Sequence, residues 1–157
     1  MESILSAIDE ILRDEMNVYG RMRELEELKT AAIMDRDGRL IESISKEQED
    51  LIIRIDLLEE KRISVTKRAT GSANTTLREL ASGSNHVILR TGSELKNMIR
   101  KLQDLQHTNG QLARDNLQYY EAIVNGLRES SSIRSGYGRD GREKSRVARP
   151  AIFSQHA

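Results

Sequence analysis

The side chains best suited to acid–base or metal chemistry are three histidines, which stand far apart at His86, His107 and His156. Imidazole titrates near neutral pH and is a common metal ligand, but a di-metal site in a helical bundle needs Glu-x-x-His pairs. The chain has none, and it has no cysteine to supply a thiolate ligand, a thiol nucleophile or a disulfide. No glycine-rich loop suggests a phosphate site. The sequence therefore predicts no enzyme, no metal site and no cofactor, and it predicts a solvated His107.

Binding chemistry is better represented, in the run LQYYEAIVNGL at residues 117–127. Tyrosines such as Tyr119 and Tyr120 are favoured at interfaces because a ring with a polar tip tolerates both wet and dry surroundings. The alternative is that both are ordinary residues of a helical bundle. Asn109 and Asn116 precede them, seven residues apart on one apolar stripe. There a polar side chain fixes register or leaves a polar notch for a partner, unless both asparagines stand at a half-exposed boundary.

The elements that must position this run are long helices. Charged residues make up 32% of the 157 residues and aromatic residues 3%, with one proline and no tryptophan, a composition typical of long helices. Apolar residues recur at steps of three and four, which predicts helices over residues 3–36 and 39–70. Asp37 and Gly38 indicate a turn between them. So short a connection predicts an antiparallel pair.

Residues 71–85 are predicted to form a crossover, the connection between the second and third long helices. Thr76 with Glu79 forms a capping-box pattern that opens a short helix over 76–82, and Gly83 is expected to end it. A third long helix is expected over 86–129, ended by the serines at 130–132. The fold predicted is all-α, a long antiparallel three-helix bundle resembling a coiled coil, with residues 1–130 as the bundle.

The third long helix is expected to outlast its neighbours by about ten residues, or roughly 15 Å, which leaves an apolar surface open to another molecule. An amphipathic helix is the expected occupant. The predicted partner-binding residues are Asn116, Leu117, Tyr119, Tyr120, Ile123, Val124, Leu127, Ile133 and Tyr137.

Residues 131–157 predict a flexible basic tail, with six basic residues against two acidic ones. Scattered arginines with few aromatic residues do not predict nucleic-acid binding. The sequence shows no basic amphipathic helix, so it does not predict binding to a membrane surface. No apolar stretch approaches the roughly 20 residues of a membrane span. The N-terminus MESILSAIDEIL has acidic residues where a signal peptide is basic. These features predict a cytoplasmic protein.

Several stretches together resemble the FlgN-like flagellar export chaperones over about residues 2–141. They are DGRLIESISKEQEDLIIRIDLLEEKR, the TLREL crossover, LQHTNGQLARDNLQYYEAIVNGL and SGYGRDG. The LLEEKR end of the second helix, Asn109, Asn116, Tyr137 and Gly141 match best.

The resemblance implies a cytosolic helical chaperone. Such a protein holds hook-associated proteins of the hook–filament junction as unassembled subunits and delivers them to the flagellar type III export gate. It also implies a client contact in the C-terminal third of the chain, on Leu117, Tyr120, Ile123, Val124 and Leu127.

Two alternatives stand beside this interpretation. One is a homo-oligomeric coiled-coil scaffold in which residues 117–127 pack against their own copy. The other is an adaptor whose basic tail binds nucleic acid or a membrane.

Overall fold

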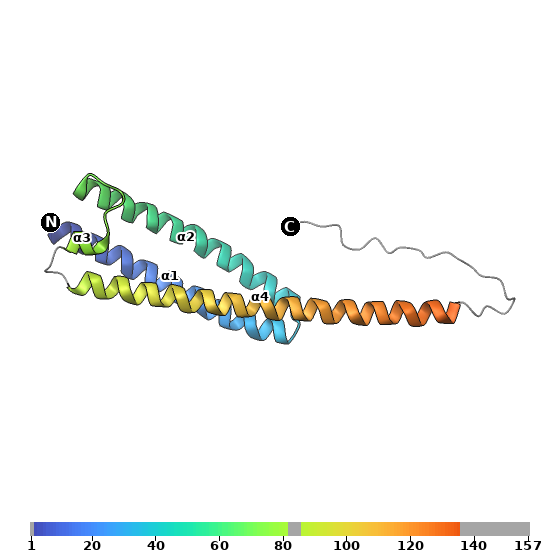
Figure 1. Ribbon diagram of the computed structural model, residues 1–157. Helices are drawn as coiled ribbons and strands as arrows, with labels where there is room; N and C mark the ends of the chain where they lie inside the picture. The colour runs from blue at the N-terminus through green and yellow to red at the C-terminus, as the bar shows by residue number, and fades with distance from the viewer. Residues whose placement is uncertain (1, 82–85, 136–157) are drawn as a thin grey trace. The chain divides into compact units, whose positions relative to one another are not determined.

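The computed structural model describes residues 2–81 and 86–135, and these form four helices (Figure 1). Three are long: α1 (Glu2–Met34), α2 (Gly38–Thr70) and α4 (His86–Ser135). The short α3 (Leu77–Ala81) lies between α2 and α4 in the sequence. Each long helix runs antiparallel to the one before it, so the predicted all-α antiparallel arrangement is confirmed.

The chain divides into two units by its internal contacts, Met1–Asp115 and Asn116–Ala157. The first unit holds α1, α2, α3 and the part of α4 that ends at Asp115. The second unit begins inside α4, which has 50 residues where α1 and α2 have 33 each. The sequence analysis placed a single bundle over residues 1–130, so the division falls 15 residues earlier than that expected boundary.

Helix α1 supplies most of the core of the first unit. Its apolar residues recur every three or four positions, which aligns them on one helical face. One cluster joins Ile8 and Leu12 to Leu80, Ile88 and Leu95, so α1 packs against both α3 and α4. A second cluster joins the far end of α1 to α2. The buried apolar side chains of α1 are Ile8, Ile11, Leu12, Val18, Met22, Leu25, Ala32 and Ile33.

A three-residue turn connects α1 to α2. The amide of Asp37 donates to the carbonyl of Ala32 and that of Arg36 to Ile33, the paired hydrogen bonds of a Schellman motif. Arg36 takes the left-handed conformation with φ 56°. The carboxylate of Asp37 then accepts a hydrogen bond from the amide of Leu40, so Asp37 caps the N-terminus of α2. The turn predicted at Asp37 and Gly38 is present, but the residue with positive φ is Arg36.

Helix α2 is only partly covered. Its fully buried residues are Ile44, Gln48 and Thr66. Two further apolar residues of α2, Ile55 and Leu58, are only half-buried.

The crossover confirms the predicted capping box. The amide of Thr76 donates to Glu79 Oε2 at 2.7 Å, and the amide of Glu79 donates to Thr76 Oγ1 at 3.2 Å. Before it, Gly71 closes α2 in the left-handed conformation with φ 76°. Helix α3 buries Leu80 and Ala81. Gly83, expected to end the short helix, lies outside the described residues.

The end of α4 differs from the expected one. The serines at 130–132 do not stop the helix, which continues to Ser135, six residues past the predicted end at 129. The Ser130 and Ser131 hydroxyls donate to the carbonyl of Leu127 at 3.0 and 2.9 Å. A serine that bonds back to its own helix is compatible with a helical backbone, which is why the triplet failed as a stop signal.

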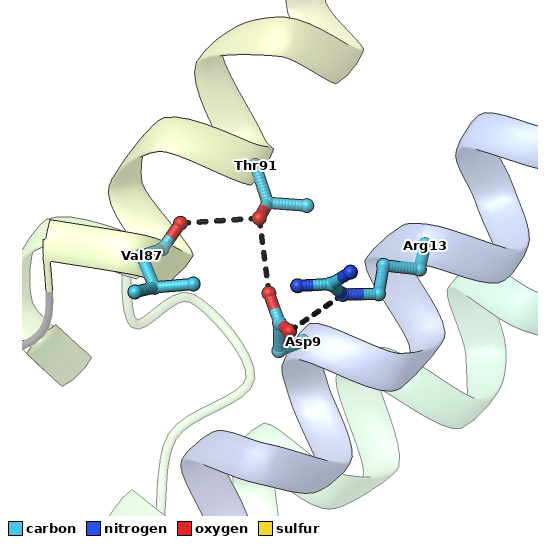
Figure 2. A network of polar contacts seen from close by, with 4 residues as sticks. All are labelled: Asp9, Arg13, Val87 and Thr91. Carbon is cyan, nitrogen blue, oxygen red and sulfur yellow. Dashed lines mark hydrogen bonds and ion pairs between the residues drawn. The ribbon is translucent and has the colours of Figure 1, made fainter.

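Polar contacts tie α4 to α1 near both ends of the first unit. Figure 2 shows the Thr91 hydroxyl between the carboxylate of Asp9 and the backbone carbonyl of Val87, at 3.0 and 3.1 Å, with Arg13 bonded to the same carboxylate at 2.8 Å. At the other end Asn109 binds Glu26. Because the α1 residues and their α4 partners rise in number together, α1 and α4 run parallel.

Candidate functional site

Six large apolar side chains of α4 are exposed in the second unit, and we call them the C-terminal apolar face. Soluble proteins bury most such side chains, so a cluster of exposed ones on one helix is informative. Their exposed fractions lie between 41% and 64%. The six are Leu117, Tyr119, Tyr120, Ile123, Val124 and Leu127.

The helical repeat places these six side chains on one side of α4. At about 100° per residue they fall within an arc of roughly 160°. Four of them follow one another at steps of three and four, from Leu117 to Leu127. Tyr119 and Ile123 extend the same face along one edge. Asn125 lies on the opposite side of the helix, so the apolar character belongs to one face only.

Three predicted partner-binding residues fall outside this face. Asn116 is half-buried in the last turn before the face. Ile133 belongs to the final turns of α4 by its backbone. Tyr137 lies outside the described residues.

Asn109 is buried in the first unit, with 2% of its surface exposed. Its side-chain amide donates to Glu26 Oε1 and to the Glu26 carbonyl, both at 2.9 Å, and its oxygen accepts from Thr30 Oγ1 at 2.7 Å. The half-exposed boundary considered for this residue is therefore wrong. The hydrogen bonds give Asn109 a role inside the bundle.

Gln48 of α2 extends this set of hydrogen bonds across a third helix. Its side-chain amide donates to Glu26 Oε2 at 2.6 Å, and its oxygen accepts from Lys29 Nζ. Glu26 and Gln48 are 3% and 7% exposed. Sequence analysis placed Asn109 on an apolar stripe but missed Glu26, because a charged residue beside such a stripe is typical of a solvated helix face.

A second buried charge in the first unit is Glu15, which is 5% exposed. Burial raises the pKa of Glu15 above its ordinary value of 4.5, and the positive charge of Arg62 opposes that rise. The Arg62 Nε atom lies 3.5 Å from Glu15 Oε1 and is buried without a hydrogen bond among the described residues. The pair joins α1 to α2, so its role is structural.

The residues that the structure describes contain neither a metal-binding cluster nor a membrane-spanning helix. Across 2–81 and 86–135, no three His, Cys, Asp or Glu side chains gather where they could hold a metal ion. No helix in the same ranges is both long enough and apolar enough to cross a membrane. His107 is exposed on α4, as predicted. The chemistry available on the C-terminal apolar face is apolar contact with another chain.

Comparison with known proteins supplies a family. A search of curated proteins and a search of solved structures each found no match. The family model described as FlgN protein matches residues 1–145, which include the whole first unit and the C-terminal apolar face. On this match the chain belongs to the FlgN family, the non-enzymatic cytoplasmic export chaperones that bind hook-associated proteins of the bacterial flagellum.

Proposed function

We propose that this export chaperone binds its hook-associated client through the C-terminal apolar face of α4. The observation that carries the proposal is the exposure of six large apolar side chains on one side of a helix, Leu127 most of all at 64%. A soluble protein gains by covering such a surface. In an export chaperone the molecule that covers it is the client.

The shape of the face favours a helical partner. An apolar arc of roughly 160° matches the stripe of an amphipathic helix, which docks through residues at steps of three and four. A client segment that packs on its neighbours in the assembled flagellum has such a stripe uncovered while the client is still a monomer. We infer that the chaperone covers the stripe until export.

Ordering of α4 sets the strength of the complex. An isolated helical segment shorter than about 12 to 15 residues is marginal in water. Residues 117–131 are all exposed, so little burial supports this segment in the free chaperone. Part of the binding free energy then goes into holding the helix, which leaves a moderate affinity that allows the client to be released. Delivery of the client to the export gate is a proposal supported by family membership alone.

Charge placed on the face tests the proposal. We expect Tyr120→Asp and Leu127→Asp each to weaken client binding at least tenfold, because an aspartate desolvated against an apolar helix costs several kcal/mol. Titration calorimetry of each variant with a purified hook-associated protein measures the loss. Circular dichroism should show a bundle with unchanged thermal stability, since both residues lie in the second unit.

Asn125→Asp is the matched control, because it places the same charge on the opposite side of the same helix. It should bind the client like the unmodified chain. Equal loss in all three variants would point to net charge or helix propensity and would contradict the proposed face. Retained binding in Tyr120→Asp and Leu127→Asp would place the client elsewhere on the chain.

A further inference from the structure

Two cavities of the first unit lie along one side of α1, each with α2 on one wall and α4 on the other. One, of about 270 Å³, opens over Leu12 and Tyr19, and the other, of about 440 Å³, opens over Lys29 and Ile33. At about 100° per residue these four side chains fall within an arc of about 100° on α1. The cavities are therefore successive parts of one depression roughly 32 Å long, at 1.5 Å per residue, which we call the α2–α4 groove.

The walls of the α2–α4 groove carry apolar side chains that are not fully covered. Ile41 and Ile55 line the groove from α2, and Ile99 lines it from α4; all three are half-buried. Ile52 and Ile63, exposed by 51% and 38%, fall within one arc of about 80° on α2 together with Ile41 and Ile55. Three helices with such a groove lack the fourth helix that completes a four-helix bundle. The groove thus has the form that accepts the apolar stripe of an amphipathic helix.

The rim of the groove on α2 is acidic. Glu49, Asp56 and Glu60 are exposed, and the helical repeat places all three within about 60° of Ile63 around α2. Burial raises the pKa of Tyr19 on the groove floor, and nearby carboxylates, Asp56 among them, add to the rise. The negative charge of this rim therefore acts on the interior of the groove.

The opposite rim, on α4, is basic. Lys96 lines the groove. Arg114 lies over Gly110, another lining residue, since a Cβ added at Gly110 would meet the Arg114 guanidinium at 3.6 Å. Lys96 and Arg114 are separated by about five full helical turns, so both lie on the same side of α4. A helix in the groove would meet negative charge along α2 and positive charge along α4.

We propose that the α2–α4 groove docks an amphipathic helix of a partner protein, with an apolar stripe flanked by Lys or Arg on one side and by Asp or Glu on the other. The two rims of opposite charge carry this assignment. The chain's own C-terminal apolar face fits it less well, because Glu121 and Arg128 stand seven residues apart on the same flank of α4. The proposal concerns the first unit and is independent of the client contact proposed for the second unit.

A designed peptide tests the proposal on the full chain. The probe is a fluorescent helix of about three heptads with Leu at a and d, Lys along one flank and Glu along the other. The comparison peptide has the same composition, but Lys and Glu alternate on both flanks, so neither direction of entry matches the rims. By fluorescence anisotropy at low salt, the first peptide should bind at least fivefold more tightly. The difference should shrink in high salt, because salt screens exposed charges.

Single substitutions in the chaperone locate the bound peptide. Ile52→Ser should weaken binding of the first peptide at least fivefold, because it removes an apolar contact from the groove wall. Leu57→Ser is the matched control, since Leu57 is 61% exposed but lies about 140° away from Ile52 around α2. It should leave the affinity unchanged, as should Leu127→Asp on the C-terminal apolar face. Circular dichroism should show an intact bundle in all three variants, because all three residues are exposed.

The same measurements can overturn the proposal. Absence of saturable binding, or equal affinity for the two peptides, would show that the groove does not select the proposed helix. A loss of binding in Leu57→Ser or Leu127→Asp, with none in Ile52→Ser, would place the peptide elsewhere. Sedimentation of the chain alone should give a monomer. A dimer that Ile52→Ser dissociates would assign the groove to a second copy in place of a partner protein.

Discussion

At the scale of single residues, Glu15 shows how burial inside the helical bundle changes the pKa of a carboxyl group. Its carboxylate is buried and faces an arginine at 3.5 Å, but desolvation outweighs that charge and raises the pKa of Glu15. A folded-state pKa above the unfolded value means that the folded protein holds the proton more tightly. Glu15 thus adds stability at low pH, and that stability is lost as the pH rises through the raised pKa.

The variant Glu15→Gln tests the direction of this pH dependence of stability. The variant has no carboxylate to ionise, so its free energy of unfolding should be closest to that of the unmodified protein below pH 4.5, the ordinary pKa. It should exceed that of the unmodified protein increasingly toward neutral pH, because only the unmodified protein must ionise a buried group. Urea denaturation at several pH values measures the difference.

Glu10→Gln, at an exposed position of the same helix, is the control for Glu15→Gln. Its free energy of unfolding should follow that of the unmodified protein across the same pH values, because an exposed side chain on the surface of α1 keeps its contact with water when the chain folds. A Glu15→Gln variant that is less stable than the unmodified protein at neutral pH would show that the ion pair with Arg62 outweighs the desolvation of Glu15.

Arg36 shows what a residue-level pattern cannot reveal. The sequence offers Gly38 for a left-handed turn residue, since glycine accepts positive φ without strain. The structure uses Arg36 instead, because α1 ends at Met34 and places the left-handed position of the Schellman motif two residues later. Gly38 falls in the first turn of α2. The turn was predictable from composition, but its register depends on where α1 stops.

At the scale of elements, Gly126 weakens the part of α4 that carries the C-terminal apolar face. A glycine inside a helix costs about 1 kcal/mol relative to alanine, and a Cβ added at Gly126 would meet no described atom within 4 Å. Gly126→Ala should therefore raise helix content in the free chaperone. If client binding includes ordering of this segment, the affinity should rise by up to about fivefold, which corresponds to the same cost of about 1 kcal/mol.

Circular dichroism and titration calorimetry check both parts of this prediction. Gly20→Ala is the matched control, because its added Cβ would meet Met98 at an ordinary 3.8 Å within the first unit. It should stabilise the bundle and leave client affinity unchanged. A helicity gain in Gly126→Ala without any gain in affinity would show that ordering of α4 is not a step in binding.

The helices differ in how well their buried faces follow from sequence. The buried face of α1 was predictable, because α2, α3 and α4 all pack against α1 and its regularly spaced apolar residues are therefore the buried ones. The buried face of α2 was less predictable. Leu51, Ile55 and Leu58 recur at steps of three and four, but they are only half-buried. A period identifies the face that turns inward, whereas the depth of burial depends on how many neighbours cover it.

At the scale of the whole molecule, the two units should differ in local stability. The first unit has a buried core and interhelix hydrogen bonds, whereas residues 117–131 are all exposed. Amide exchange follows local opening, which is easiest where few side chains are buried. We expect amides of residues 8–25 to exchange slowly and those of 117–131 to exchange fast, by mass spectrometry of the free chaperone.

Addition of a client should change this pattern in one place. Slower exchange confined mainly to residues 117–131 is the expected result, since the proposed contact covers that part of α4. Protection spread over α1 and α2 without change in 117–131 would contradict the proposed client site. The comparison uses the full chain, so it needs no truncated fragment.

The candidate site was partly predictable at this scale. The sequence identified the six residues of the C-terminal apolar face because their period and their tyrosines are unusual for a chain with 3% aromatic residues. Their exposed fractions are a property of the folded chain. The hydrogen bonds of Asn109 were not predictable, since Glu26 stands 83 residues away in sequence and only the fold brings the two together.

The sequence separation between contacting residues also predicts the order in which the helices associate during folding. The hydrogen bonds between α1 and α2 join residues 19 to 26 positions apart, whereas those between α1 and α4 join residues 79 to 83 apart. Closing a short loop is faster than closing a long one, and a ribosome synthesises the chain from its N-terminus. Every residue of the α1–α2 hairpin is available once synthesis has passed Thr70. The three-residue turn at Arg36 thus gives the growing chain a template on which α4, the last long helix to be synthesised, can dock.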